Sequence, residues 1–286
     1  MRIKGMILDV DGVIIGEKIG FNSPSPHPEV ISALKKLRLK GIFVSLCTAK
    51  PQFAIKNIIE SAELDNLHIT DGGGVIIDPI ANVTLKANII DSPSAVKVLE
   101  VYLKNNVYTE FYTLDDYFIQ ESQASEITKK HAYILQREPK RVKSLTEFAN
   151  QNKITKIMPI ANNQDDKKRL VNFFKPFEKD LVLSWGIHPV ALPLQFGIIT
   201  AKGISKKNAC EEIIKSANIS FDEVLGVGDS ASDWQFIQLC KYGAAMGNAS
   251  KELKELVKSK GKGFSYIARS VDENGIIDVF KHFKIL

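Results

Sequence analysis

Two aspartates lie close together at the end of the first apolar segment of the chain. Met6–Val13 reads MILDVDGV, so Asp9 and Asp11 are two residues apart and a glycine follows them. Residues two apart in a β-strand point to the same side of the sheet. Two carboxylates that close repel each other unless a cation neutralises them or one of them holds a proton. Both conditions serve catalysis, and the pair therefore predicts a Mg²⁺-dependent site for phosphoryl transfer.

A second acidic pair follows a second apolar strand. Asp229 and Asp233 are four residues apart, and the small residues Gly228 and Ser230–Ser232 allow the chain to turn between them. Carboxylate oxygens suit Mg²⁺, which keeps several waters and takes its other ligands from carboxylates and phosphate. The alternative is that Asp233 only caps the helix that follows it.

Two further residues are suited to binding phosphate oxygens. Thr48 ends an apolar strand, so its hydroxyl and the N–H of Ala49 stand at the start of the next predicted helix, where anions bind. Lys206 lies in the first turn of another predicted helix, where the helix dipole disfavours a cation unless an anion is present. The alternatives are a simple helix cap for Thr48 and a solvated side chain for Lys206.

The elements that carry these residues alternate between strand and helix. Predicted strands cover about 5–10 and 42–47, with a helix over 28–40 between them, and the same alternation resumes with strands at 223–227 and 243–246. Continuous apolar strands of this kind are typical of parallel sheets covered on both faces. The fold class predicted is α/β, with a doubly wound, Rossmann-like parallel sheet, which binds ligands at the carboxyl ends of its strands.

The middle of the chain has a different pattern, with strands of polar alternation and separate helices. This predicts an α+β cap domain over residues 80–194, inserted into a core formed by residues 1–79 and 195–286. Helices are expected near 94–105, 144–151 and 165–174, and a strand pair at 181–185 and 190–194.

Composition favours a protein of the cytoplasm with a small-molecule partner. The 286 residues carry a net charge of only +5, and no basic and aromatic face supports nucleic-acid binding. No apolar run approaches the ~20 residues that cross a bilayer, and Met1–Lys4 leads directly into the first strand, which leaves no room for a signal peptide. Cys47, Cys210 and Cys240 are scattered, as expected of reduced thiols. The sequence does not indicate an oligomeric state.

Taken together, these motifs resemble those of haloacid dehalogenase (HAD) superfamily phosphatases of the Cof type. This group, class IIB, has a large α/β cap and includes archaeal phosphoglycolate phosphatases, sugar-phosphate phosphatases and phosphomannomutases. The resemblance spans the whole chain, and its motifs are Asp9–Gly12, Thr48, Gly203–Lys206, Gly228–Asp233 and Met246–Ala249.

The resemblance implies a role for each matching residue. Asp9 would be the nucleophile that becomes an aspartyl-phosphate, and Asp11 would protonate the leaving oxygen and then activate water. The Mg²⁺ ligands would be Asp9, the main-chain carbonyl of Asp11, Asp229 and, through water, Asp233. The residues that would bind the phosphate oxygens are Thr48, Ala49 and Lys206. Lys202 competes with Lys206 for this role, but the Gly-Ile-Ser-Lys phrase favours Lys206.

The chain also departs from the family pattern at three places. The usual Thr-Gly-Arg reads Thr48-Ala49-Lys50, the Asn before the last Asp is Ser232, and the Asn-Gly-Ala turn reads Gly72–Gly74. Lys50 and Asn248 are the predicted substrate contacts of the core. The candidates in the cap are His131, Tyr133, Arg137, Trp185 and His188.

These observations predict a phosphatase that hydrolyses a small phosphorylated metabolite, of the sugar phosphate or phosphoglycolate type. A phosphomutase that uses the same aspartyl-phosphate is one alternative. A catalytically silent binding or regulatory protein on the same fold is another, because a fold alone does not assign activity. A nucleotide-binding dehydrogenase is disfavoured, since no GxGxxG follows the first strand.

Overall fold

The computed structural model describes residues 3–286, except for the side chain of Pro189, and they form two compact units. The first unit contains the residues up to Thr48, Ile55–Leu85 and Ser205–Leu286, and the second contains Ala49–Ala54 and Lys86–Ile204. The predicted role of Met1 and Arg2 lies outside the described residues. No helix within residues 3–286 has the length and apolar character needed to cross a bilayer. The boundaries of the inserted domain over residues 80–194, which come from the sequence pattern, stay a prediction. The role of that domain as a cap also stays a prediction.

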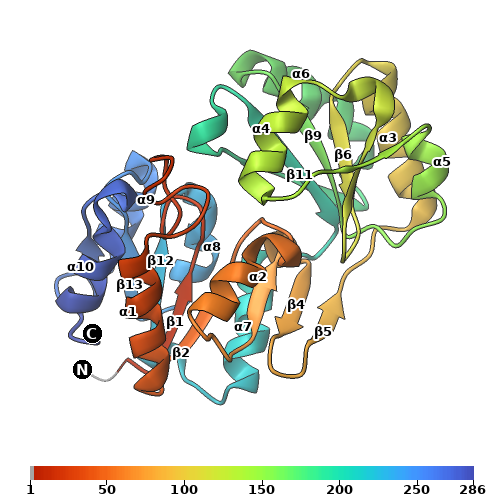
Figure 1. The fold of residues 1–286 in the computed structure, drawn as a ribbon. Coiled ribbons are helices and arrows are strands. Elements are labelled where there is room, and N and C mark those ends of the chain that lie inside the picture. The colour runs from red at the N-terminus through yellow and green to blue at the C-terminus, as the bar shows by residue number, and fades with distance from the viewer. Residues whose placement is uncertain (1–2) are drawn as a thin grey trace. The chain divides into compact units, whose positions relative to one another are not determined.

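The first unit is built on a parallel sheet of five strands (Figure 1). In spatial order these are β14 (Ser265–Ile267), β13 (Tyr242–Ala245), β12 (Val224–Gly228), β1 (Gly5–Leu8) and β2 (Phe43–Leu46). From β1 the chain proceeds outward to β2, whereas β12, β13 and β14 follow one another on the other side. The order therefore reverses between β1 and β12, which is the point where such sheets bind ligands. The predicted α/β class with a doubly wound sheet is confirmed.

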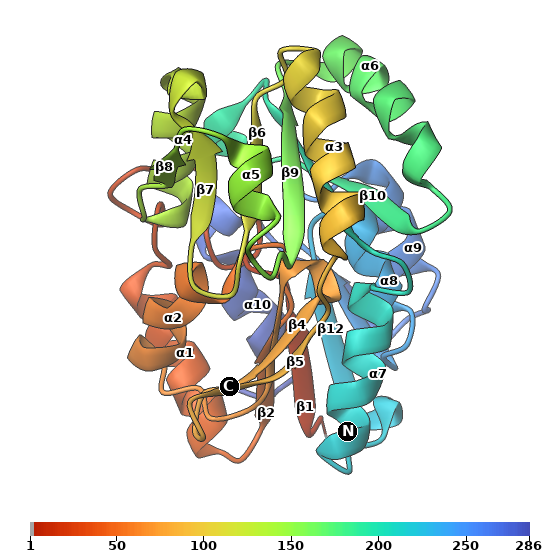
Figure 2. The same cartoon turned by 90° about the vertical axis from the view of Figure 1, so that its right-hand side faces the viewer.

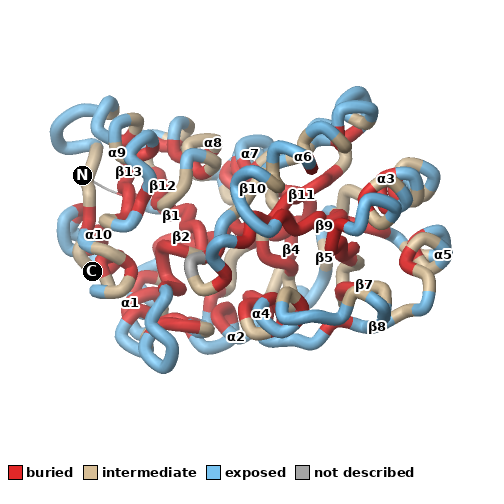
Figure 3. The backbone as a smooth tube through the Cα atoms, turned by 90° about the horizontal axis from the view of Figure 1, so that it is seen from above, coloured by how far each residue is buried: buried red, intermediate tan, exposed pale blue. Residues whose placement is uncertain are grey.

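The four longer strands of this sheet are buried along their whole length, as the red segments in Figure 3 show, because helices cover the sheet. Ile213, Phe236 and Val257, each from a different helix, belong to one apolar cluster with residues of the strands. The helices of this unit are α1 (Pro28–Leu39), most of α2 (Gln52–Ser61), α7 (Lys206–Ser216), α8 (Trp234–Ile237), α9 (Lys251–Lys258) and α10 (Gly275–His282). A small sheet of β3 (His68–Thr70), β4 (Val75–Asp78) and β5 (Val83–Ala87) follows α2.

The second unit contains a six-stranded, mostly antiparallel sheet. Its spatial order is β10 (Leu181–Gly186), β11 (Gln195–Ala201), β9 (Lys156–Ala161), β6 (Thr109–Tyr112), β7 (Tyr117–Gln120) and β8 (Lys140–Val142). Three helices, α3 (Ser92–Lys104), α5 (Leu145–Ala149) and α6 (Gln164–Phe174), share an apolar cluster on one face, and α3 and α5 lie over β9 and β7 (Figure 2). The helix α4 (Glu126–Leu135) contributes Ile134 and Leu135 to a second cluster on the other face.

One expectation for the second unit was wrong, and one of its helices was not predicted. The predicted strand over 190–194 does not form; the strand that pairs with β10 is β11, over Gln195–Ala201. Pro189 and Pro193 lack the N–H that a ladder requires, and the uninterrupted strand begins only after them. The helix α4 was missed, because it buries the polar residues Thr128 and His131, which hide its apolar periodicity.

Candidate active site

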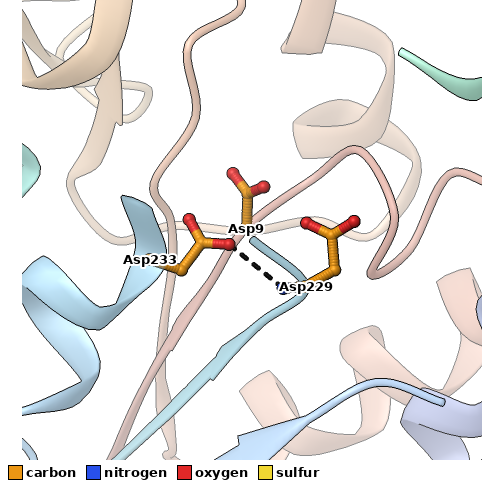
Figure 4. A group of neighbouring side chains, drawn as sticks. All are labelled: Asp9, Asp229 and Asp233. Carbon is orange, nitrogen blue, oxygen red and sulfur yellow. Dashed lines mark hydrogen bonds between the residues drawn. The ribbon is translucent and has the colours of Figure 1, made fainter. Parts of the chain in front are cut away.

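Asp9 and Asp229 lie beside each other where the strand order reverses. Leu8 of β1 pairs with Val227 of β12, and the Asp9 N–H donates to the Val227 carbonyl at 3.0 Å. Each aspartate therefore leaves the carboxyl end of one of two adjacent parallel strands. One carboxylate oxygen each from Asp9, Asp229 and Asp233 lies within 4.8 Å of the other two (Figure 4).

Asp233 is fully buried and both of its oxygens accept hydrogen bonds. Oδ2 accepts from the backbone N–H groups of Asp229 and Ser230, each at 3.0 Å, and from the Ser230 hydroxyl at 3.1 Å. The first of these bonds is the dashed line in Figure 4. Asp233 does not bond forward to cap α8, as the alternative interpretation proposed; it holds the turn that carries Asp229. Ser230 was not recognised from the sequence, where a serine in a turn has no distinctive signal.

Lys206 connects two of the three carboxylates. Its Nζ donates to Asp9 Oδ1 at 2.9 Å and to Asp233 Oδ1 at 2.7 Å, and the side chain is buried. Lys202, in contrast, donates to the Lys179 carbonyl and is exposed. The chain approaches the start of α7 so closely at Gly73, with φ +105°, that a Cβ there would lie 2.4 Å from the Ser205 carbonyl oxygen. This contact requires glycine at position 73 of the Gly72–Gly74 turn.

The charges in this cluster perturb one another. Burial raises the pKa of Asp9 to about 7, and repulsion from Asp233 adds to this while Lys206 opposes it. Burial also raises the pKa of Asp229 well above its usual range, with Asp233 and Asp9 as the repelling neighbours. Burial alone would lower the pKa of Lys206, but Asp233 and Asp9 outweigh it and raise that pKa well above its usual value. One ammonium therefore does not compensate the three carboxylates.

The donor set fits a hard divalent cation such as Mg²⁺. Three carboxylates with excess negative charge offer oxygen ligands within a small space. Because both Asp233 oxygens already accept hydrogen bonds, Asp9 and Asp229 are the better placed to bind an ion directly. Gly12 makes room for this arrangement: with φ +76°, a Cβ there would lie 1.9 Å from Asp229 Oδ2.

Asp11 lies beyond the end of β1 and is partly buried. It adds to the charges that raise the pKa of Asp9 and of Asp229. Thr48 is buried beyond the end of β2, where its N–H donates to the Ile69 carbonyl and its own carbonyl accepts from the Gly72 N–H.

The two predicted substrate contacts of the core have other partners. The Asn248 amide donates to the Gly12 carbonyl and accepts from the Val271 N–H, each at 2.9 Å, so it positions the loop after β1. The Lys50 ammonium donates to the Ile134 carbonyl within the second unit. Contact of either residue with substrate stays a prediction.

Of the candidates in the second unit, His131 and Tyr133 lie on α4, Arg137 follows it, and Trp185 lies on β10. His131 is buried and its Nδ1 lies 2.8 Å from Oε2 of Glu110, a fully buried carboxylate that the sequence analysis missed. Arg137 forms an ion pair with Asp116, and Trp185 lies beneath the ammonium of Lys167. Tyr133 packs against the apolar cluster that contains Ile134 and Leu135, and His188 is buried.

The acidic cluster therefore lies at the switch point of a doubly wound α/β sheet, where such sheets bind their ligands. Residues 6–280 match the family model of haloacid dehalogenase-like hydrolases, and the chain belongs to this family.

Individual relatives are distant but match over nearly their whole length. Pyridoxal phosphate phosphatase YbhA of Escherichia coli strain K12 is 25% identical, over 89% of this chain and 91% of the relative. Phosphoglycolate phosphatase of Staphylothermus marinus is 23% identical, over 91% of this chain and 92% of the relative. A solved structure of the HAD subclass IIB sugar phosphatase BT4131 is 21% identical, covers 99% of this chain and all of its own, and superposes with a TM-score of 0.78. That likeness shows a shared fold.

Proposed function

We propose that this hydrolase is a Mg²⁺-dependent phosphatase that cleaves a small phosphorylated metabolite, of the sugar phosphate or phosphoglycolate type. The observation that carries the proposal is the cluster of Asp9, Asp229 and Asp233 around Lys206 at the switch point of the sheet. The names of two relatives, a pyridoxal phosphate phosphatase and a phosphoglycolate phosphatase, support small phosphomonoesters as the substrate class.

Asp9 is the nucleophile in this mechanism. One of its carboxylate oxygens forms a bond to phosphorus while the bond from phosphorus to the ester oxygen breaks, which gives an aspartyl-phosphate. Lys206 holds Asp9 Oδ1 at 2.9 Å and thereby fixes the plane of the attacking carboxylate. The same ammonium, with Thr48 and the Ala49 N–H, stabilises the phosphoryl oxygens as charge redistributes.

Asp11 moves the protons. It gives a proton to the departing oxygen, and then takes a proton from the water that attacks the aspartyl-phosphate and releases inorganic phosphate. Asp233 keeps Lys206 and the Asp229 turn in place through its four hydrogen bonds.

Asp9, Asp229 and the main-chain carbonyl of Asp11 would hold Mg²⁺, which would supply positive charge to offset that of the nucleophile and the phosphate. The cytoplasm is the proposed location, and the free, buried state of Cys47, Cys210 and Cys240 supports a reducing compartment. The proposed partner is the phosphorylated metabolite, with no nucleic acid and no membrane.

The test is phosphate release from p-nitrophenyl phosphate by wild type, Asp9→Asn and the control Asp222→Asn, an exposed aspartate of the same unit. Wild type and the control are expected to release phosphate with Mg²⁺ and not with EDTA. Asp9→Asn is expected to lose activity on the order of 10⁴-fold or more, as when a catalytic nucleophile is removed. Equal release in all conditions would contradict the mechanism, and an isomer in place of free phosphate from a sugar phosphate would indicate a mutase.

A further inference from the structure

The segment Ala49–Ala54, which follows the strand-end Thr48, belongs to the second unit and contacts other residues of that unit. Gln52 Nε2 donates to the Leu114 carbonyl at 2.8 Å, and the Phe53 ring stacks on the Tyr117 ring with centroids 6.1 Å apart. Ala54 joins an apolar cluster of that unit. The side chains of Gln52, Phe53 and Ala54 therefore anchor this segment to other parts of the second unit.

A buried lysine holds the first peptide of this segment. Lys156 on β9 is fully buried, and its Nζ donates to the Ala49 carbonyl at 2.7 Å. The same ammonium lies 4.3 Å from the centre of the Tyr112 ring, directly across the β6–β9 ladder. Because a buried ammonium is costly without such partners, the geometry at Ala49 is held tightly.

A second lysine fixes the next residue. Lys50 is buried, and its Nζ donates to the carbonyl of Ile134 at 2.9 Å, in the last turn of α4. The carbonyl end of a helix carries partial negative charge and favours a cation. Lys156 thus anchors the Ala49 carbonyl and Lys50 anchors its own side chain to α4, and we name this pair of contacts the lysine clamp.

We propose that Lys156 and Lys50 are positioning residues that hold the loop after Thr48 in its phosphate-binding conformation. The peptide group is planar, so an anchored Ala49 carbonyl fixes the plane of the peptide that directly follows the Ala49 N–H, the group assigned to phosphate in the proposed mechanism. In this proposal the ammonium of Lys50 binds the last turn of α4 and does not bind the substrate. The proposal rests on the proposed function, because it assumes that this loop binds phosphate.

The first test is kinetic and uses inorganic phosphate as an inhibitor of p-nitrophenyl phosphate hydrolysis. Lys156→Met is expected to raise the inhibition constant of phosphate by about tenfold, the scale of a lost charged hydrogen bond. The matched control is Lys167→Met, since Lys167 also lies over a ring, Trp185 at 5.1 Å, but belongs to α6 and not to the clamp. The control is expected to leave the constant unchanged. An unchanged constant in Lys156→Met would overturn the proposal, even with a lower melting temperature.

Lys50 provides an independent variant if Lys156→Met does not fold. Lys50→Met is expected to weaken phosphate inhibition, and Lys50→Arg is expected to restore it because the cation is retained. A side chain that only stabilised the fold would change the melting temperature without this pattern of loss and rescue. Equal inhibition constants in all three proteins would contradict the clamp.

The second test does not depend on activity. Amide hydrogen exchange over residues 50–54 is expected to be at least about tenfold faster in Lys156→Met than in wild type, because the anchored loop opens locally. Unchanged exchange overturns the clamp. If wild type hydrolyses no phosphomonoester, the proposed function fails, and the exchange measurement still decides whether the clamp exists.

Discussion

The two units bury charged side chains in opposite ways. The first unit gathers Asp9, Asp229 and Asp233 near the ammonium of Lys206, which bonds to two of them. The second unit surrounds one buried carboxylate with neutral donors and a histidine. Glu110 accepts from the Tyr108 hydroxyl at 3.2 Å and the Tyr112 hydroxyl at 2.6 Å, and it lies 2.8 Å from His131 Nδ1.

This difference in how the carboxylates are paired distinguishes a candidate catalytic site from a structural network. In the cluster of the first unit three carboxylates lie near the ammonium of Lys206, and burial, with added repulsion between the carboxylates, raises the pKa values of Asp9 and Asp229. A divalent ion and a phosphate would complete it. In the second unit each Glu110 oxygen has a fixed donor, so the network is complete and holds α4 on the sheet. The carboxylates that outnumber their cation therefore mark the candidate catalytic site, whereas the carboxylate of Glu110, whose oxygens both have donors, has a structural role.

The largest effect is expected from removing the one ammonium of the acidic cluster. Lys206→Met leaves Asp9 and Asp233 buried without their shared cation, and breaking a buried pair in this way costs about 3–5 kcal/mol. Activity is expected to fall at least about 10²-fold, because a donor to the transferring group is lost. Thermal unfolding of Lys206→Met and of wild type, each in EDTA and in Mg²⁺, measures the loss of stability. Mg²⁺ is expected to restore part of the stability, and a variant as stable as wild type in EDTA would show that the cluster does not need the ammonium.

The next effect concerns pH. The pKa of Asp9 is about 7 in the folded protein and about 4 in an unfolded chain. Between these values the folded state holds a proton that the unfolded state has released, so stability in EDTA is expected to be greatest below pH ~4 with respect to this group and to fall as pH rises to ~7. The loss is on the order of 2–4 kcal/mol. It is measured as the difference in unfolding free energy between wild type and Asp9→Asn, and parallel pH profiles would contradict the excess charge assigned to this cluster.

A smaller effect is expected where the backbone makes room for Asp229. In Gly12→Ala the new Cβ would lie 1.9 Å from Asp229 Oδ2, so the carboxylate must move. The Mg²⁺ concentration for half-maximal activity is expected to rise about 10–100-fold, the range seen when a metal ligand is displaced by its surroundings. Gly20→Ala is the matched control, because Gly20 also has a positive φ, +81°, but nothing within 4 Å of its Cβ position. The same shift in both variants would assign the effect to backbone strain.

The acidic cluster could be predicted from the sequence because each of its residues follows a strong local signal. Asp9 and Asp229 end continuous apolar strands, and parallel strands bring such ends together. The placement of Lys206 follows from the Gly-Ile-Ser-Lys phrase. The family match confirms the resemblance on which the roles of these residues were based.

The second unit was harder to predict because its polar residues are buried by long-range pairing. Glu110 and Lys156 lie on separate strands and read as ordinary exposed positions of alternating segments. Their burial depends on a sheet in which Tyr112 faces Lys156 across the β6–β9 ladder. No local pattern reports such a partner, and α4 was missed for the same reason, since its buried face contains Thr128 and His131.

The smallest effect is expected from neutralising the satisfied network. Glu110→Gln retains the shape of the side chain but weakens its bonds to Tyr112 and His131, and it is expected to cost about 1–2 kcal/mol of stability. Because the partners of Glu110 among the described residues, Tyr108, Tyr112 and His131, belong to the second unit, the Mg²⁺ requirement and the pH profile set by Asp9 are expected to stay as in wild type. Unfolding in urea together with a Mg²⁺ titration of activity makes the measurement. A shifted Mg²⁺ requirement in this variant would remove the distinction between the two networks, because the charge of Glu110 would then act on the chemistry as well as on the fold.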